Sequence, residues 1–259
     1  MILDDILQET RRALSLAQGQ TTLAELNNQA AKAPPVRDFG AALRSRAGVA
    51  CIAEFKRRSP SKGWIRQDAS PAKVAAAYQA AGAAAISVLT DGPFFGGSLE
   101  DLRQVRATVN IPVLRKDFIV DVFQIVEARA AGADAVLLIV AALPQDRLVG
   151  LLAEVRRWGM EALVETHDRA EVERALAAGA RIIGVNHRDL RTFQMDMTLA
   201  TNLRSLIPAD RVLVAESGIR TPDDVKRMQA AGINAILVGE GLMAGPDPGL
   251  ALRELLGRP

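Results

Sequence analysis

The sequence predicts an α/β protein, a (β/α)8 TIM barrel with an N-terminal helical extension. One observation is that four Ala-Gly pairs each close an Ala-rich stretch and open an apolar run: Ala81-Gly82, Ala131-Gly132, Ala178-Gly179 and Ala231-Gly232. A helix that ends at a C′ glycine before a strand gives this pattern. A second observation is that the pairs stand about 50 residues apart, twice one strand-plus-helix unit, with further apolar runs between them. Alternating strands and helices pair in parallel, and eight units are typical of this barrel.

Residues 1–47 precede the repeat and predict helices of their own. The first stretch has the apolar spacing of an amphipathic helix, with Ile2, Leu3, Ile6, Leu7, Leu14 and Leu16. Leu23–Ala31 predicts a second helix, and Ala33-Pro34-Pro35 is expected to end it, because proline interrupts helical hydrogen bonding. We expect residues 1–47 to cap one mouth of the barrel within a single domain that spans residues 1–259.

Eight apolar runs are the expected strands. Four of them follow the Ala-Gly pairs, and the other four are Val49–Glu54, Val109–Leu114, Ala162–Glu165 and Arg211–Ala215. An open doubly wound sheet is the alternative architecture. The even spacing of the units and the absence of a Gly-x-Gly-x-x-Gly turn argue against it.

Helix starts support the alternation. Ser70-Pro71 and Thr221-Pro222 each place an N-cap residue before a proline at the first helical position. Asp121 with Gln124, and Asp168 with Glu171, resemble capping boxes, in which two side chains satisfy the first free N–H groups of a helix.

Composition excludes several classes of protein. The 259 residues are 49% hydrophobic and carry a formal net charge of +2 without a basic stripe, so no nucleic-acid partner is expected. One cysteine, Cys51, excludes an intrachain disulfide and a Cys-based zinc site, and is expected to be a small buried thiol. Two histidines leave little material for a metal site, and we expect neither a metal nor another cofactor.

The acidic N-terminus lacks a signal-peptide layout, and no apolar stretch approaches the ~20 residues that span a bilayer. We therefore expect a cytoplasmic monomer without a membrane partner.

Ionisable residues end several of the expected strands. Glu54 and Lys56 end the first, Lys116 ends the third just before Phe118, and Glu165 ends the fifth. In these barrels, side chains at the carboxyl ends of strands form the active face. Burying a charge costs free energy unless it is paired, so recurrent charged strand ends indicate a ligand or a paired network.

The sixth to eighth strands add polar residues and glycine turns. Asn186 and Arg188 follow the sixth strand, Glu216-Ser217-Gly218 follows the seventh, and Gly239-Glu240-Gly241 follows the eighth. Glycine turns after the last two strands form the usual phosphate cradle of these barrels, where backbone N–H groups favour an anion. His187 is expected to be a surface residue of a loop.

The basic loop Arg57–Gln67 follows the first strand and is either a lid or a solvated loop. As a lid, it would be mobile without ligand, because its cations are expected to contact only solvent until an anion arrives.

Five segments, in this order and at these strand ends, resemble the signature segments of indole-3-glycerol phosphate synthases: Glu54–Ser61, Leu114–Phe118, Leu163–Glu165, Val185–Leu190 and Ala215–Ile219. The similarity covers essentially the whole chain, including the N-terminal extension. At the position of His187 the family often has Asn or Ser. The resemblance implies a lyase of tryptophan biosynthesis that closes the indole ring of 1-(2-carboxyphenylamino)-1-deoxyribulose 5-phosphate, with loss of carbon dioxide and water.

The resemblance also implies roles for the strand-end residues. Lys116 is the principal acid at the substrate carbonyl and Glu165 its acid-base partner. Glu54 holds the aniline nitrogen or polarises the lysines, and Lys56 reaches the substrate carboxylate or phosphate and serves in dehydration. The remaining catalytic positions, which orient hydroxyl groups and lysines, are Asn186 and Glu216.

Substrate contacts are implied in the same way. Ser59 and Arg188 are implied to contact the substrate carboxylate. Phe118 and Leu137 are implied to line the pocket for the anthranilate ring. Phosphate is held chiefly through backbone N–H groups by Ser217, Gly218, Gly239 and Glu240.

Two other readings remain at this point. Related barrels, of the phosphoribosylanthranilate isomerase or tryptophan synthase α type, would bind a similar phosphate. However, neither needs the set of Glu54, Lys56 and Lys116, and neither carries residues 1–47. In a non-catalytic barrel the strand-end charges would be internal ion pairs.

Overall fold

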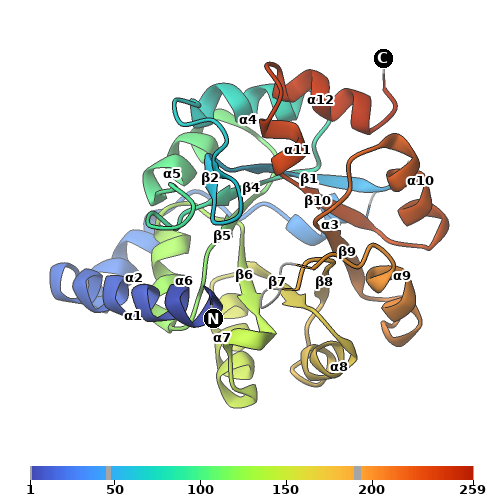
Figure 1. Cartoon of the computed structure of the whole chain (residues 1–259). Coiled ribbons are helices and arrows are strands. Elements are labelled where there is room, and N and C mark those ends of the chain that lie inside the picture. Colours follow the sequence, from blue (N-terminus) through green and yellow to red (C-terminus); the bar gives the residue numbers. More distant parts are fainter. Residues whose placement is uncertain (1, 45–47, 190–193, 259) are drawn as a thin grey trace.

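The computed structural model describes residues 2–44, 48–189 and 194–258 (Figure 1). Of the expectations above, residues 1 and 45–47 of the extension and Leu190 of the fourth signature segment lie outside the described residues.

Eight parallel strands close into a barrel at the centre of the molecule (Figure 1). Around the barrel, each strand pairs with its neighbours in the order β1-β10-β9-β8-β7-β6-β5-β4, and β4 returns to β1. Their bounds are β1 Ala50–Phe55, β4 Ala85–Leu89, β5 Val113–Lys116, β6 Ala135–Ile139, β7 Glu161–Thr166, β8 Ile182–Asn186, β9 Val212–Glu216 and β10 Ala235–Val238. Closure confirms the predicted barrel, because a doubly wound sheet would leave two free edges.

Helices surround the strands. They are α4 Pro71–Ala80, α5 Leu99–Thr108, α6 Val122–Ala130, α7 Gln145–Arg157, α8 Arg169–Ala177, α9 Leu199–Leu203, α10 Pro222–Ala230, α11 Glu240–Met243 and α12 Pro248–Leu255, with 3-10 turns η1 Val140–Ala142 and η2 Arg204–Leu206. A short antiparallel hairpin of β2 Arg58–Ser59 and β3 Gly63–Trp64 follows β1.

Most of the expected helix starts are confirmed. Ser70 and Thr221 are N-caps before a proline, and Asp121 forms a capping box with Gln124. The second expected capping box was wrong in one half. Asp168 accepts from the backbone N–H of Glu171, but the Glu171 carboxylate turns to the backbone N–H of His167 instead.

The third strand of the barrel, β5, starts later than the sequence predicted. Val109 is the C-cap residue of helix α5, and the strand begins only at Val113. Pro112 separates the two, and a proline has no N–H to donate to a strand ladder. Cys51 is buried as expected, and burial raises the pKa of its thiol to about 12.

Residues 2–44, the described part of the extension, form three helices, one more than the sequence predicted. In addition to α1 Ile2–Gln20 and α2 Leu23–Lys32, a five-residue helix α3 spans Phe39–Leu43. Helix α2 packs against α6, where Leu26 and Ala30 contact Phe123 and Val126.

The extension reaches both ends of the barrel. Ile6 and Leu7 of α1 join the apolar cluster that fills the barrel interior, and Ile2, Leu3 and Ile6 line the pocket at the carboxyl ends of the strands. At the other end, Phe39 and Leu43 are fully buried in the same cluster. There the backbone N–H of Gly40 donates to the carboxylate of Glu161, the first residue of β7.

No helix among the described residues combines the length and apolar character needed to cross a membrane.

Candidate active site

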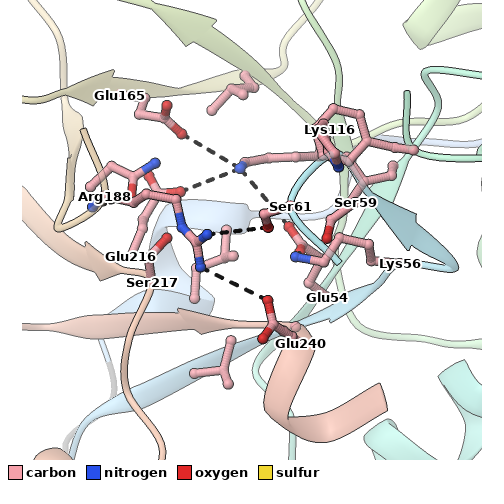
Figure 2. A pocket seen from close by; sticks show the side chains of 18 of the residues that line it. Glu54, Lys56, Ser59, Ser61, Lys116, Glu165, Arg188, Glu216, Ser217 and Glu240 are labelled. Atoms are coloured by element: carbon pink, nitrogen blue, oxygen red, sulfur yellow. Dashed lines mark hydrogen bonds and ion pairs between the residues drawn. The ribbon is translucent and has the colours of Figure 1, made fainter. Parts of the chain in front are cut away.

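A cavity of about 390 Å³ opens at the carboxyl ends of the barrel strands. Its lining includes all fourteen residues expected at the site: Glu54, Lys56, Ser59, Lys116, Phe118, Leu137, Glu165, Asn186, Arg188, Glu216, Ser217, Gly218, Gly239 and Glu240. They come from seven of the eight strand ends or the loops just after them. Figure 2 shows how the charged members converge.

Lys116 stands at the centre of the charged group (Figure 2). Its Nζ lies 3.5 Å from an oxygen of Glu165, 3.5 Å from one of Glu216 and 3.9 Å from one of Glu54. Burial alone would lower the pKa of Lys116, but the three carboxylates, Glu165 foremost, raise that pKa well above its usual range. The ammonium group therefore stays charged and able to donate a proton.

Glu54 carries a second lysine partner. Lys56 Nζ lies 2.9 Å from Glu54 Oε1. Burial of Glu54 would raise the pKa of its carboxyl, but Lys56 and Lys116 together lower it, so Glu54 is ionised. Gly239 leaves room for this carboxylate, since a Cβ there would lie 2.3 Å from Glu54 Oε1.

The neighbouring carboxyls Glu165 and Glu216 differ in protonation. Burial would raise the pKa of Glu165, but Lys116, His167 and the amide of Asn186 lower it far below its usual range. Burial and the charge of Glu165 raise the pKa of Glu216 to about 8, against the pull of Lys116. At neutral pH the site thus holds an ionised Glu165, a protonated Glu216 and a cationic Lys116. Environments that push neighbouring pKa values apart in this way are how active sites assign acid and base roles.

Gly184 of β8 makes this crowding possible. A Cβ on Gly184 would lie 2.2 Å from Glu216 Oε1, so only glycine leaves space for that carboxylate. This role could not be predicted from the sequence, because Gly184 and Glu216 come from different strands.

Two glycine turns border the cavity. Ser217 and Gly218, after β9, both have positive φ, at 67° and 78°, and Ser217 is the only non-glycine residue with this conformation in the described part of the chain. Successive residues in such conformations point backbone N–H groups to one side and make a concavity suited to an anion. Gly239 and Glu240, after β10, begin helix α11 and also line the cavity, and β10 is the strand next to β9.

Arg188 spans the mouth between two loops. Its guanidinium donates to Ser61 Oγ at 3.4 Å and lies 3.8 Å from Glu240 Oε2 (Figure 2). The Asn186 side chain accepts from the Arg188 backbone N–H at 3.0 Å, which fixes the start of this loop.

The expectation that the cations of Arg57–Gln67 contact only solvent was wrong. Arg57 makes two bonds to Asp101, at 2.6 and 2.9 Å, and Arg66 donates to the carbonyls of Gly245 and Pro246. Arg58 donates to the carbonyl of Pro93. Arginine contacts with neighbouring loops and with helix α5 thus lie at both ends of this loop.

One wall of the cavity is apolar. Phe118 and Leu137 were expected there, and Phe95 adds a ring tilted against Phe118 at a centroid distance of 6.1 Å. Ile2, Leu3 and Ile6 of α1 complete this wall. Sequence reasoning missed Phe95 and the helix α1 contribution, although the apolar face of α1 was visible as a signal.

The expectation for one histidine was wrong, and the other histidine was overlooked. His187, expected at the surface, is 1% exposed, because its ring packs under the 216–218 turn and its Nδ1 bonds to the Ser217 carbonyl at 2.9 Å. Burial lowers the pKa of His187, so the ring is neutral. His167, to which no role was given, lies 3.3 Å from Glu165 Oε1.

Comparison with known proteins shows the family of this chain. The family model for indole-3-glycerol phosphate synthase matches residues 3–255. "Indole-3-glycerol phosphate synthase 2" of Streptomyces coelicolor is 54% identical over 256 residues, 99% of either chain. "Indole-3-glycerol phosphate synthase" of Rhodopirellula baltica is 48% identical over 255 residues, 98% of either chain.

Solved structures agree with the fold alone. The crystal structure of KGPDC from Streptococcus mutans has a TM-score of 0.61 at 13% identity and covers 80% of this chain and 96% of its own. A mandelate oxidase variant has a TM-score of 0.60 at 18% identity and covers 80% and 71%. The near-complete family match and the close relatives set aside the other two readings of the sequence. The chain belongs to the indole-3-glycerol phosphate synthase family.

Proposed function

We propose that the cavity closes the indole ring of 1-(2-carboxyphenylamino)-1-deoxyribulose 5-phosphate and releases indole-3-glycerol phosphate, carbon dioxide and water. The observation that carries this proposal is the Lys116 ammonium among three carboxyl groups, since ring closure needs a proton donor held where a carbonyl is attacked.

The substrate fits the cavity by its parts. The apolar wall of Phe118, Leu137 and Phe95 takes the aryl ring. The turns at Ser217-Gly218 and Gly239-Glu240 take the phosphate through backbone N–H groups. In this orientation Ser59 and Arg188 face the aryl carboxylate. The ribulose carbonyl then lies near Lys116.

Proton transfer proceeds in two stages. Lys116 donates to the carbonyl oxygen while the aryl carbon attacks, and loss of carbon dioxide restores the aromatic ring. In the dehydration that follows, one acid protonates the departing hydroxyl and Glu165, which is ionised, accepts a proton from the ring. Lys56 is positioned as the second acid, beside Glu54. Asn186 and protonated Glu216 hold the substrate hydroxyls and orient Lys116.

A fluorescence assay tests this function, because the indole product and the anthranilate-type substrate differ in their emission. We expect the purified protein to convert the ribulose phosphate with release of one carbon dioxide per indole formed. Binding of the substrate without turnover would overturn the proposal.

We also infer that the protein acts in the cytoplasm as a monomer, on a small anionic substrate and without nucleic acid or membrane. Light scattering of the purified protein, with and without substrate, checks the monomer.

A further inference from the structure

His167 lies behind Glu165, between two carboxylates. Its Nε2 is 3.3 Å from Glu165 Oε1 and its Nδ1 is 3.1 Å from Glu171 Oε2. The anchor at Glu171 is itself fixed, because the same Oε2 accepts the backbone N–H of His167 at 2.7 Å and Glu171 belongs to the first turn of α8. The ring is thus held in one place and one orientation relative to the strand end.

This arrangement favours the charged imidazolium. Burial alone would lower the pKa of His167, but Glu165 from β7 and Glu171 from α8 raise it to about 10. On the far side of Glu165 lie Lys116 from β5, Glu216 from β9 and the amide of Asn186 from β8.

Glu165 needs this second cation. Its carboxylate is buried, and Lys116, the cation on its Oε2 side, is shared with Glu54 and Glu216. His167 lies instead beside Oε1, so each oxygen of Glu165 has a cation beside it, and the cation beside Oε1 is not shared with Glu54 or Glu216. We propose that His167 is a positioning residue that orients the Glu165 carboxylate and keeps it ionised as the proton acceptor of the reaction, with Glu171 as its anchor. This inference rests on the proposed function, in which Glu165 accepts a proton.

The charge of His167 can be read without an activity assay. The chain has two histidines, so an imidazole ¹⁵N spectrum contains two rings, and a His187→Asn variant assigns them. We expect His167 to remain an imidazolium from pH 5 to about pH 9. A His167 ring that titrates near the ordinary value of about 6.5 would overturn the proposal.

The effect on catalysis is tested with His167→Gln, which retains a hydrogen-bond donor and removes the charge. Loss of an adjacent charge should raise the pKa of Glu165 by about 1–3 units. An acidic limb should therefore appear or move upward in the pH profile of kcat, with a loss of about tenfold one pH unit below the raised pKa of Glu165, while KM changes little. Glu171→Gln should move the limb in the same direction by less.

The matched control is Glu173→Gln on the same helix, where an exposed carboxylate faces only the exposed Arg169. This variant should leave the profile unchanged. If His167→Gln lowers the thermal midpoint but leaves the acidic limb in place, His167 is structural only and the inference fails. If the unmodified protein turns over no substrate, the proposed function fails, and the imidazole titration still decides whether His167 carries its charge.

Discussion

At the scale of single residues, the chemistry depends on how one buried ammonium is shared. Lys116 faces three carboxylates, and Glu54 has Lys56 in addition. One cation cannot neutralise both Glu165 and Glu216, so one of them binds a proton. His167 on the Glu165 side decides which, and Glu216 is the carboxyl that is protonated.

Lys116→Met tests the central acid. Methionine preserves much of the side-chain volume and removes the proton donor and the charge that stabilises the developing alkoxide. Positioned proton transfer and electrostatic stabilisation each contribute factors of about 10²–10³ or more, so kcat should fall by at least ~10³-fold while substrate binding weakens far less. Steady-state kinetics measures this, and product inhibition with thermal unfolding checks that the barrel is intact. If the variant keeps more than about a tenth of the original kcat, the essential proton comes from another group, and Lys56 is the next candidate.

Glu216→Gln should stabilise the protein at high pH. The folded pKa of Glu216 is about 8, against about 4.3 in an unfolded chain, so the folded state binds more protons between these values. Stability therefore falls as pH rises through this window, and glutamine removes that loss. We expect the thermal midpoint of the variant to exceed that of the original protein by more at pH 9 than at pH 5, with a lower kcat at both. An equal difference at both pH values would contradict the raised pKa.

Sequence reasoning placed correctly the residues whose position follows from their place on a strand. Glu54, Lys116 and Glu165 lie within the last two residues of their strands, and strand ends of parallel barrels meet at one mouth. It was wrong for His187 and made no prediction for His167, because the burial of both depends on partners that other elements bring: Glu171 from the next helix and the Ser217 carbonyl from the next strand loop.

At the scale of elements, the turn after β9 carries the proposed phosphate site. Gly218 has φ of 78°, and a Cβ there would lie 2.3 Å from Met197 Sδ. Gly218→Val should therefore distort the Ser217-Gly218 backbone that faces the phosphate and raise KM for the substrate, with the fold retained because methionine can move.

Gly159→Val is the matched control, since Gly159 has φ of 70° at the end of α7, outside the cavity lining, and no atom within 4 Å of a Cβ. Both variants carry the same backbone strain, but only Gly218→Val should change KM. Equal KM values in the two variants would remove this turn from the phosphate site.

The elements themselves were predictable to different degrees. Apolar spacing predicted helices α1 and α2, and capping residues predicted barrel helices such as α4 and α10. Helix α3 was not predicted, because its five residues are too few to show a helical period. Its position at the far end of the barrel depends on the Glu161 carboxylate, which lies 121 residues away in the chain.

At the scale of the whole molecule, the extension and the barrel share one interior. The repeat of Ala-Gly pairs sufficed to predict eight units, but the way in which residues 2–44 attach was not readable from it. Helix α1 contributes Ile6 and Leu7 to the interior cluster, α3 contributes Phe39 and Leu43, and both contact the side chains of the strands there.

This shared interior predicts that the extension and the barrel unfold as one domain. Trp158, at the end of α7, packs against the cluster of Leu26 and Ala30 in the extension, so its fluorescence reports loss of α2. Far-UV circular dichroism reports the barrel. In a Trp64→Phe background, which leaves Trp158 as the sole tryptophan, the two thermal curves should superimpose. Phe39→Ala leaves a cavity in the interior and should cost about 3–5 kcal/mol, which shifts both curves together to lower temperature. A Trp158 transition that precedes the loss of circular dichroism would show instead that the extension detaches from a barrel that stays folded alone.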